Sequence, residues 1–214
     1  MNLRHIFILP ALLTAMACSD DSPVTPDTPD TPDGPDITNS VEKLVSIDAG
    51  QTFQTIAGFG ASDCWTPAFV GKSWTSHRAG ITELLFSSEI VGGKPKGIGL
   101  SQWRVNLGGG SAAQGEACGI EDKSRRAESY LTDDLTYDWT RCEGQRYFMD
   151  RAKELGCNNF VLFSNTPPVQ YTYNGKGFSA RGGLSNLKPE HYGDFAGDMD
   201  DVAARDTAEG YHLR

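Results

Sequence analysis

From residue 78 onward the sequence alternates between helix-like and strand-like segments, and this alternation most limits the folds that the chain can adopt. Residues 97–107 and 158–165 are short, largely apolar runs, which are typical of buried strands. Apolar side chains recur at helical spacing in the segments around them, which are 78–90, 138–155 and 189–209. Because strands that alternate with helices pack as a parallel sheet, the sequence predicts an α/β fold.

Polar and aromatic side chains follow the predicted strands, at the edge of the sheet where α/β folds place their functional sites. The candidates are Asp63 and Trp65 after a first strand, Arg104 and Asn106 at the end of the second, and Asn165 at the end of the third. We expect these five side chains to form half of a substrate-binding site.

The second strand is predicted to have two different faces. Leu100, Gln102, Arg104 and Asn106 share one face by strand alternation, and we interpret this face as the interior of a barrel. Trp103 points the other way, and we expect it to pack against helices as a core residue.

The segment after the second strand, 108–136, is rich in glycine and charge, which predicts a long loop. Such a loop in a compact domain is usually functional. Gly108–Gly110 is not followed by the Lys-Ser/Thr of a phosphate-binding loop, so no nucleotide cofactor is expected. Residues 211–214 are typical of the beginning of another strand, so we expect the chain to be the N-terminal fragment of a longer protein.

The N-terminus is predicted to be an export signal rather than part of the fold. Residues 1–17 contain a basic residue, an apolar run and small residues, as secretory signal peptides do. Cys18 follows Ala-Met-Ala, which resembles the lipobox of bacterial lipoproteins, and residues 19–40 form a Thr-Pro-Asp tether that cannot bury a core. We expect a surface-exposed outer-membrane lipoprotein anchored through Cys18; the alternative is an ordinary signal peptide with an incidental cysteine.

Charge and cysteine content exclude several other functions. The net charge is −9, and six of the acidic residues lie in the tether 19–40. An acidic chain lacks the basic face that a nucleic acid requires, so no nucleic-acid partner is expected. No Cys-x-x-Cys or His-Cys cluster indicates a metal site. We expect at least two of four cysteines to be buried as small apolar residues, with one disulfide as the alternative: Cys64, Cys118, Cys142 and Cys157.

Six motifs occur in order along the chain, and together they are more specific than any one of them. They are TIAGFGASDCW, GIGLSQWRVNLGGGSAAQG, RRAESYL, YDW, GQRYF and FSNTPPVQYTYNGKG. Over about residues 43–214 the sequence resembles the N-terminal part of bacterial glycoside hydrolases of family 30, most closely the endo-β-1,6-galactanase branch.

The resemblance implies a fold and a domain organisation. The fold is a (β/α)8 TIM barrel with an attached β-sandwich. Residues 41–52, where Val45 and Ile47 share one face before a turn, would form a hairpin of the sandwich. Residues 53–214 would form about three strand–helix units of an incomplete barrel.

The resemblance also implies retaining hydrolysis of O-glycosyl bonds in a β-linked polysaccharide, with β-1,6-galactan as the expected glycan. That mechanism uses two glutamates, and both are expected beyond Arg214, so the fragment alone is expected to be inactive. Carboxylates of the chain itself are interpreted as surface or structural groups, so none is assigned a catalytic role. The alternative is a surface lipoprotein that binds glycan without cleaving it.

Each candidate residue has a functional and a structural interpretation. By the resemblance, Arg104 pairs with the nucleophile carboxylate; alternatively it pairs structurally with another carboxylate. Asp63 accepts sugar hydroxyls or caps a turn. Trp65 stacks on a sugar ring or packs in the core. The amides of Asn106 and Asn165 would complete the substrate contacts.

Overall fold

The computed structural model describes residues 45–180 and 182–214. The predicted signal peptide 1–17, the lipidated Cys18 and the tether 19–40 lie outside the described residues. By its internal contacts the chain divides into two units, Met1–Phe53 and Gln54–Arg214, and each is described by itself.

Three parallel strands form the sheet of the larger unit, in the order β1 (Gly60–Ser62), β4 (Gln102–Asn106) and β5 (Asn159–Phe163). Trp103 pairs with Ala61 on one side and with Phe160 on the other. Leu213 forms a parallel bridge to Phe160, which is consistent with the strand expected at the C-terminal end. The strands follow one another in the sheet as they do in the chain, which confirms the prediction of a parallel α/β fold.

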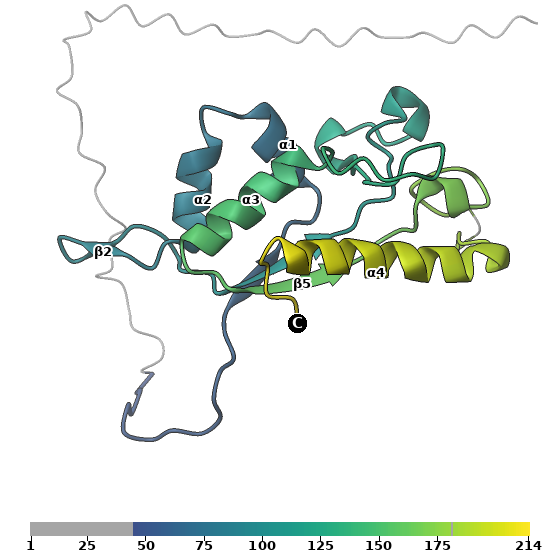
Figure 1. Ribbon diagram of the computed structural model, residues 1–214. Helices are drawn as coiled ribbons and strands as arrows, with labels where there is room; N and C mark the ends of the chain where they lie inside the picture. Colours follow the sequence, from purple (N-terminus) through teal and green to yellow (C-terminus); the bar gives the residue numbers. More distant parts are fainter. Residues whose placement is uncertain (1–44, 181) are drawn as a thin grey trace, which may run out of the picture. The chain divides into compact units, whose positions relative to one another are not determined.

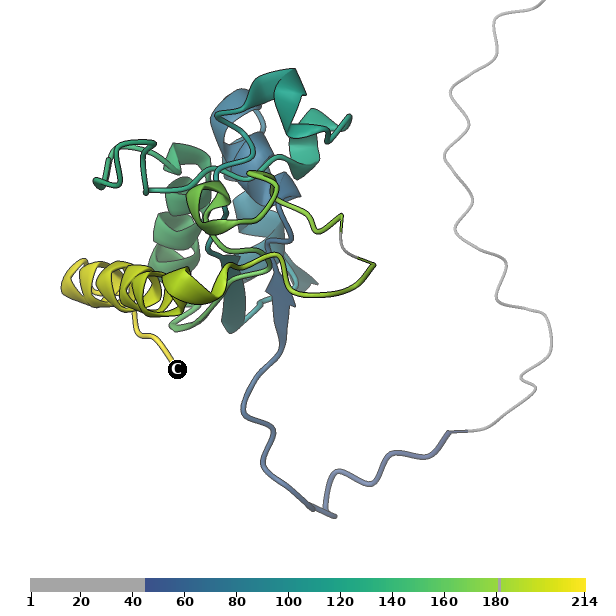
Figure 2. The same ribbon diagram turned by 90° about the vertical axis from the view of Figure 1, so that its right-hand side faces the viewer.

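Helices connect the strands. They are α1 (Thr66–Ser73) and α2 (Arg78–Phe86) after β1, α3 (Glu143–Glu154) after β4, and α4 (Tyr192–Ala208) after β5. Figures 1 and 2 show α1, α2 and α3 together on one side of the sheet. The sequence predicted α2, α3 and α4 but missed α1, although Pro67 in its first turn is a helix-start signal.

The remaining elements are short. They are a hairpin of β2 (Ile90–Val91) and β3 (Lys94–Pro95), and the 3-10 helices η1 (Gly115–Cys118), η2 (Lys123–Arg125), η3 (Val169–Tyr171) and η4 (Pro189–His191). The segment 108–136 is a loop, as predicted, and contains η1 and η2.

The main core lies between the sheet and the helices. Trp103 is 2% exposed, and its ring contacts Phe86 of α2 edge-on at 5.0 Å and stacks with Phe148 of α3 at 6.3 Å. This confirms the core role predicted for Trp103. Leu100 was predicted to share a face with Arg104, and this is wrong: β4 begins only at Gln102, and the left-handed Gly99 turns Leu100 into the helix-side core.

Helices α1 and α3 pack with their backbones in contact. A Cβ at Gly71 would collide with the carbonyl oxygen of Gly144, and a Cβ at Gly144 would collide with that of Ala68. Only glycine at both positions permits this approach. The contact holds α1, and with it the turn after β1, against the start of α3.

The described part of the smaller unit contains a turn but no strand. Gly50 donates its backbone N–H to the Asp48 carboxylate at 2.9 Å, and Gln51 donates to the Asp48 carbonyl at 3.2 Å. Val45 and Ile47 are 77% and 87% exposed. No strand forms over residues 45–52, and residues 41–44 lie outside the description, so the hairpin predicted over 41–52 stays a prediction.

All four cysteines of the described chain are free thiols. Cys118, Cys142 and Cys157 are buried and Cys64 is exposed. This confirms the prediction that at least two would be buried, and no disulfide joins any of them. The part of the chain in view contains no helix that is both long and apolar enough to cross a membrane.

Candidate functional site

Asp63 joins the ends of β1 and β4. Its backbone N–H donates to the carbonyl of Arg104 at 3.0 Å, and its carboxylate accepts the backbone N–H of Asn106 at 3.1 and 3.2 Å. The side-chain amide of Gln145, from α3, donates to the same carboxylate at 2.5 Å and to the carbonyl of Asn106 at 2.8 Å. Two strand ends and one helix are thereby fixed to each other.

Burial controls the ionisation of Asp63. The side chain is 1% exposed, and loss of water raises its pKa to about 6, while hydrogen bonds from Gln145 and Asn106 and the charge of Arg104 act in the opposite direction. In the described chain the carboxylate is enclosed by backbone and amide groups that donate hydrogen bonds to it. Asp63 ties β1 to β4 there, and its carboxyl group also interacts with the backbone of Cys64 in the next turn.

Asn106 extends this network to the third strand. Its side-chain oxygen accepts the backbone N–H of Asn165 at 3.3 Å, and the backbone N–H of Leu107 donates to the carbonyl of Phe163 at 2.7 Å. Asn106 is buried. The structure thus brings Asp63, Asn106 and Asn165 together at the carboxyl ends of the strands, as the sequence predicted.

Trp65 lies on a turn with unusual backbone angles. Cys64 has a φ of 29° and Trp65 a φ of 73°, and positive φ is uncommon for residues other than glycine. Such conformations cost free energy and cluster at functional sites. Trp65 is only partly buried, and the guanidinium carbon of Arg125 lies 5.3 Å from the centre of its ring. Trp65 lines a larger cavity on one side and borders a small enclosed space beside the buried Asn106 and Gln145 on the other.

The larger cavity, which we call the strand-end cavity, has a volume of about 510 Å³. Its walls include Trp65, Ser111, Asp122, Arg125, Asn165 and Phe178. Small-molecule sites typically measure about 300–1,000 Å³ and combine aromatic surface with a few polar groups. The strand-end cavity has that composition, and it brings together the predicted residues Trp65 and Asn165.

Comparison with known proteins decides the family. Residues 42–213 match the family model described as O-glycosyl hydrolase family 30. The chain belongs to O-glycosyl hydrolase family 30.

Two solved structures show how this family-30 chain compares with whole proteins. A conserved exported protein from Bacteroides fragilis is 36% identical, with a TM-score of 0.71, and the match covers 78% of this chain and 35% of that one. SrfJ from Salmonella typhimurium is 17% identical, with a TM-score of 0.52, and the match covers 75% and 33% of the two chains. The chain therefore spans about a third of the length of these structures. No curated protein sequence matches it.

Arg104 of the family-30 chain lies apart from the strand-end cavity. It is exposed on the side of β4 opposite Trp103, and its guanidinium carbon lies 3.4 Å from the centre of the Phe163 ring on the neighbouring strand. A separate cavity of about 370 Å³ is lined by Arg104, Gln102 and residues of β1. Arg104 thus occupies the face of the sheet predicted for it, and the cation–π contact holds its side chain along that face.

The sequence missed several residues of this candidate site. Gln145 is the most important, because it donates to both Asp63 and Asn106. The sequence does contain a signal for Gln145. It is a polar residue three positions before Phe148, on the inward face of a predicted helix. Arg125 and Phe178 also line the strand-end cavity. Arg125 lies in the short 3-10 helix η2 and Phe178 in an irregular segment, and neither carries a comparable pattern.

The acidic residues of the described loop 108–136 have structural partners or lie at the surface. Asp122 accepts hydrogen bonds from the backbone and the hydroxyl of Ser124, both at 2.8 Å, and these lower its pKa. Glu128 forms an ion pair with Lys72, while Glu116 and Glu121 are on or near the surface. Within the described residues no group of three or more His, Cys, Asp or Glu side chains is placed to hold a metal ion.

Proposed function

We propose that this chain is part of a retaining O-glycosyl hydrolase that acts on a β-linked polysaccharide, with β-1,6-galactan as the preferred glycan. One observation carries the proposal. In a family-30 chain, Trp65 and Asn165 converge on a cavity at the carboxyl ends of parallel strands, which is where barrel enzymes bind substrate.

The residues present have distinct roles in this proposal. Trp65 stacks on the apolar face of a sugar ring, and the amide of Asn165 binds a hydroxyl. Asn106 and Asp63 position the strand ends and do not themselves contact the glycan. Arg104 holds the nucleophile carboxylate ionised through paired hydrogen bonds from its guanidinium.

The two catalytic carboxylates are proposed to come from the part of the family fold that this chain does not cover. Retaining hydrolysis requires two carboxyl groups about 5–5.5 Å apart, one as nucleophile and one as acid and base. Support comes from the limited coverage, since the chain spans 35% of the exported relative from Bacteroides fragilis.

We further propose that the protein is exported and anchored to the outer membrane through lipidated Cys18. The support is the order of signal peptide, cysteine and acidic tether in the sequence, together with a similar solved structure whose name describes an exported protein. A tether rich in proline would hold the catalytic body away from the bilayer, where a polysaccharide can reach it.

A surface lipoprotein that binds glycan without cleaving it is the second candidate. It is favoured by the lining of the strand-end cavity as far as the chain is described, in which Asp122 is engaged by Ser124 and Glu121 is the other carboxylate. This candidate predicts glycan binding with no product, so the two functions differ in one measurable outcome.

The test compares Trp65→Ala with Trp74→Ala in the whole protein that carries this chain. Trp74 is 50% exposed at the end of α1 and serves as the matched control, because it lies outside the strand-end cavity. Calorimetry with β-1,6-galactotriose and chromatography of products from β-1,6-galactan are the measurements. We expect Trp65→Ala to weaken binding and slow hydrolysis by about tenfold or more, the scale of losing one aromatic contact. Equal behaviour of the two variants would refute the role of the cavity.

A further inference from the structure

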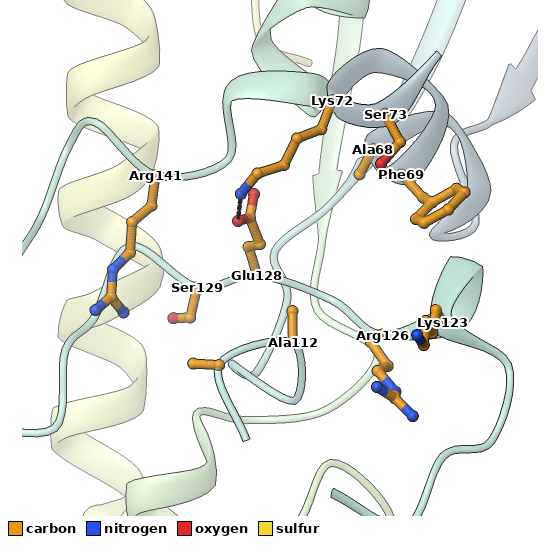
Figure 3. Close-up of a pocket in the computed structure, with 11 residues that line it drawn as sticks. Ala68, Phe69, Lys72, Ser73, Ala112, Lys123, Arg126, Glu128, Ser129 and Arg141 are labelled. Carbon is orange, nitrogen blue, oxygen red and sulfur yellow. Dashed lines mark hydrogen bonds and ion pairs between the residues drawn. The ribbon is translucent and has the colours of Figure 1, made fainter. Parts of the chain in front are cut away.

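A second cavity lies between α1 and the loop 108–136, and its charge is unlike that of the rest of the chain. Its volume is about 540 Å³, and its walls include Phe69, Lys72, Lys123, Arg126, Glu128 and Arg141 (Figure 3). We call it the basic cavity. Four cations and one carboxylate among these residues contrast with the net charge of −9 of the chain.

Two of the cations already have partners. Lys72 pairs with Glu128 in the middle of the basic cavity, and Figure 3 shows this pair as a dashed contact. Arg141 pairs with Asp138 at 3.4 Å and donates to the carbonyl of Leu131 at 3.4 Å. These contacts satisfy Lys72 and Arg141 without an external anion.

The other two cations, Lys123 and Arg126, have no ion pair within the described residues. Arg126 donates through Nε to the carbonyl of Ile120 at 2.8 Å and through Nη2 to that of Glu121 at 3.4 Å, which fixes the guanidinium. Its charge also acts on the carboxylate of Asp122, without forming an ion pair. Lys123 and Arg126 belong to the same tight turn, in which the backbone N–H of Arg126 donates to the carbonyl of Lys123 at 3.3 Å. A held guanidinium beside a flexible ammonium is suited to binding a carboxylate.

The basic cavity adjoins the strand-end cavity. Consecutive residues of the same loop line one and then the other: Ser111 and Ala127 face the strand-end cavity, and Ala112 and Glu128 face the basic cavity. The paired segments at Ser111–Ala112 and Ala127–Glu128 therefore form a wall that the two cavities share.

We propose that the basic cavity binds the carboxylate of an acidic saccharide, with Lys123 and Arg126 as its ligands and Phe69 as an apolar wall for the sugar ring. The volume is large for a free inorganic anion and falls within the range of about 300–1,000 Å³ that is typical of small-molecule sites. Only the saccharide nature of the ligand rests on the proposed function; the anion site itself does not depend on hydrolysis.

The test is a calorimetric titration of the whole protein with trigalacturonic acid, with neutral β-1,6-galactotriose and with inorganic phosphate. Lys123→Glu is the variant, because Lys123 is exposed and has no ion pair to lose within the described chain. Lys94→Glu is the matched control, since it makes the same charge change on the exposed β2–β3 hairpin, away from the basic cavity.

We expect Lys123→Glu to weaken trigalacturonic acid binding by about tenfold or more, the scale of losing one charge-assisted hydrogen bond, and Lys94→Glu to change it by less than about twofold. Equal losses in both variants, or no binding to the wild type, would overturn the proposal. Phosphate binding as tight as that of trigalacturonic acid would also overturn it, because it would indicate a simple anion site.

The neutral trisaccharide separates this proposal from the proposed function. If galactotriose binding depends on Trp65 while trigalacturonic acid binding is insensitive to Lys123, only the basic-cavity proposal fails. If trigalacturonic acid binding depends on Lys123 while no glycan is hydrolysed, the proposed enzyme activity fails and the basic-cavity proposal stands.

Discussion

Replacing Asp63 by Asn tests whether a buried carboxyl group joins the strand ends. The substitution keeps the size of the side chain and one acceptor for the backbone N–H of Asn106, and it removes the ionisable group. It also replaces an oxygen that accepts from Gln145 with a donor, so some loss of stability is expected at every pH. The informative quantity is how the stability difference from wild type varies with pH.

The structure gives both the sign and the size of this variation. Burial raises the pKa of Asp63 from 3.8 to about 6, so the folded protein holds this proton more tightly than the unfolded chain does. The stabilisation is complete below pH of about 4 and is lost as pH rises through about 6. At about 1.36 kcal/mol per pKa unit, this amounts to about 3 kcal/mol in the free energy of unfolding.

The assay is urea unfolding followed by tryptophan fluorescence between pH 4 and pH 7, since Trp103 is in the core. We expect the stability advantage of wild type over Asp63→Asn to shrink by about 2–2.5 kcal/mol across this range, because part of the full change falls below pH 4. Asp200→Asn, on the exposed side of α4, is the matched control and should show no such trend. If Asp63→Asn does not fold, the pKa of Asp63 can be read from carboxyl carbon shifts of the wild type. A difference that is constant with pH, or a carboxyl group that titrates near 4, would refute the reasoning.

Three further predictions follow from other parts of the molecule. Gly144→Ala should lower the free energy of unfolding by about 1–3 kcal/mol because the α1–α3 backbones are in contact, whereas Gly80→Ala, with open space around it in α2, should stabilise by about 0.5–1 kcal/mol in the same urea assay. Cys18→Ala should abolish palmitate labelling and release the protein from the membrane fraction; a variant that remains there would contradict the lipid anchor. Arg104→Ala in the whole protein should move the acid limb of the pH–rate profile up by about 1–3 units, with partial rescue by Arg104→Lys, and an unmoved limb with an unchanged kcat would make Arg104 structural.

The sequence predicted best where periodicity and burial act together. The strands around Trp103 and Phe160 and helix α3 each bury one consistent face, so their apolar spacing was sufficient to find them. Helix α1 was missed because it is short and its contact with α3 is made by glycine, which leaves no apolar pattern. The 41–52 hairpin was predicted from partial alternation and was assigned to the sandwich by the resemblance, and it stays a prediction.

The candidate site could be predicted only in part. Asp63, Asn106 and Asn165 each lie at or directly after the end of a predicted strand. This location was enough to place them together, because parallel strands end at the same edge of the sheet. The same location could not predict that Asp63 is buried while Trp65 lines a cavity. That difference depends on the left-handed backbone at Cys64 and on the hydrogen bond from Gln145 of α3.

The stereochemistry of hydrolysis tests the central claim most directly. Proton NMR of a β-1,6-galacto-oligosaccharide mixed with the whole protein reports which anomer is released before mutarotation. We expect the β anomer first, as two carboxylates acting by double displacement require. Release of the α anomer first would contradict the retaining mechanism. Binding of the oligosaccharide without any product would show that the protein binds glycan without cleaving it.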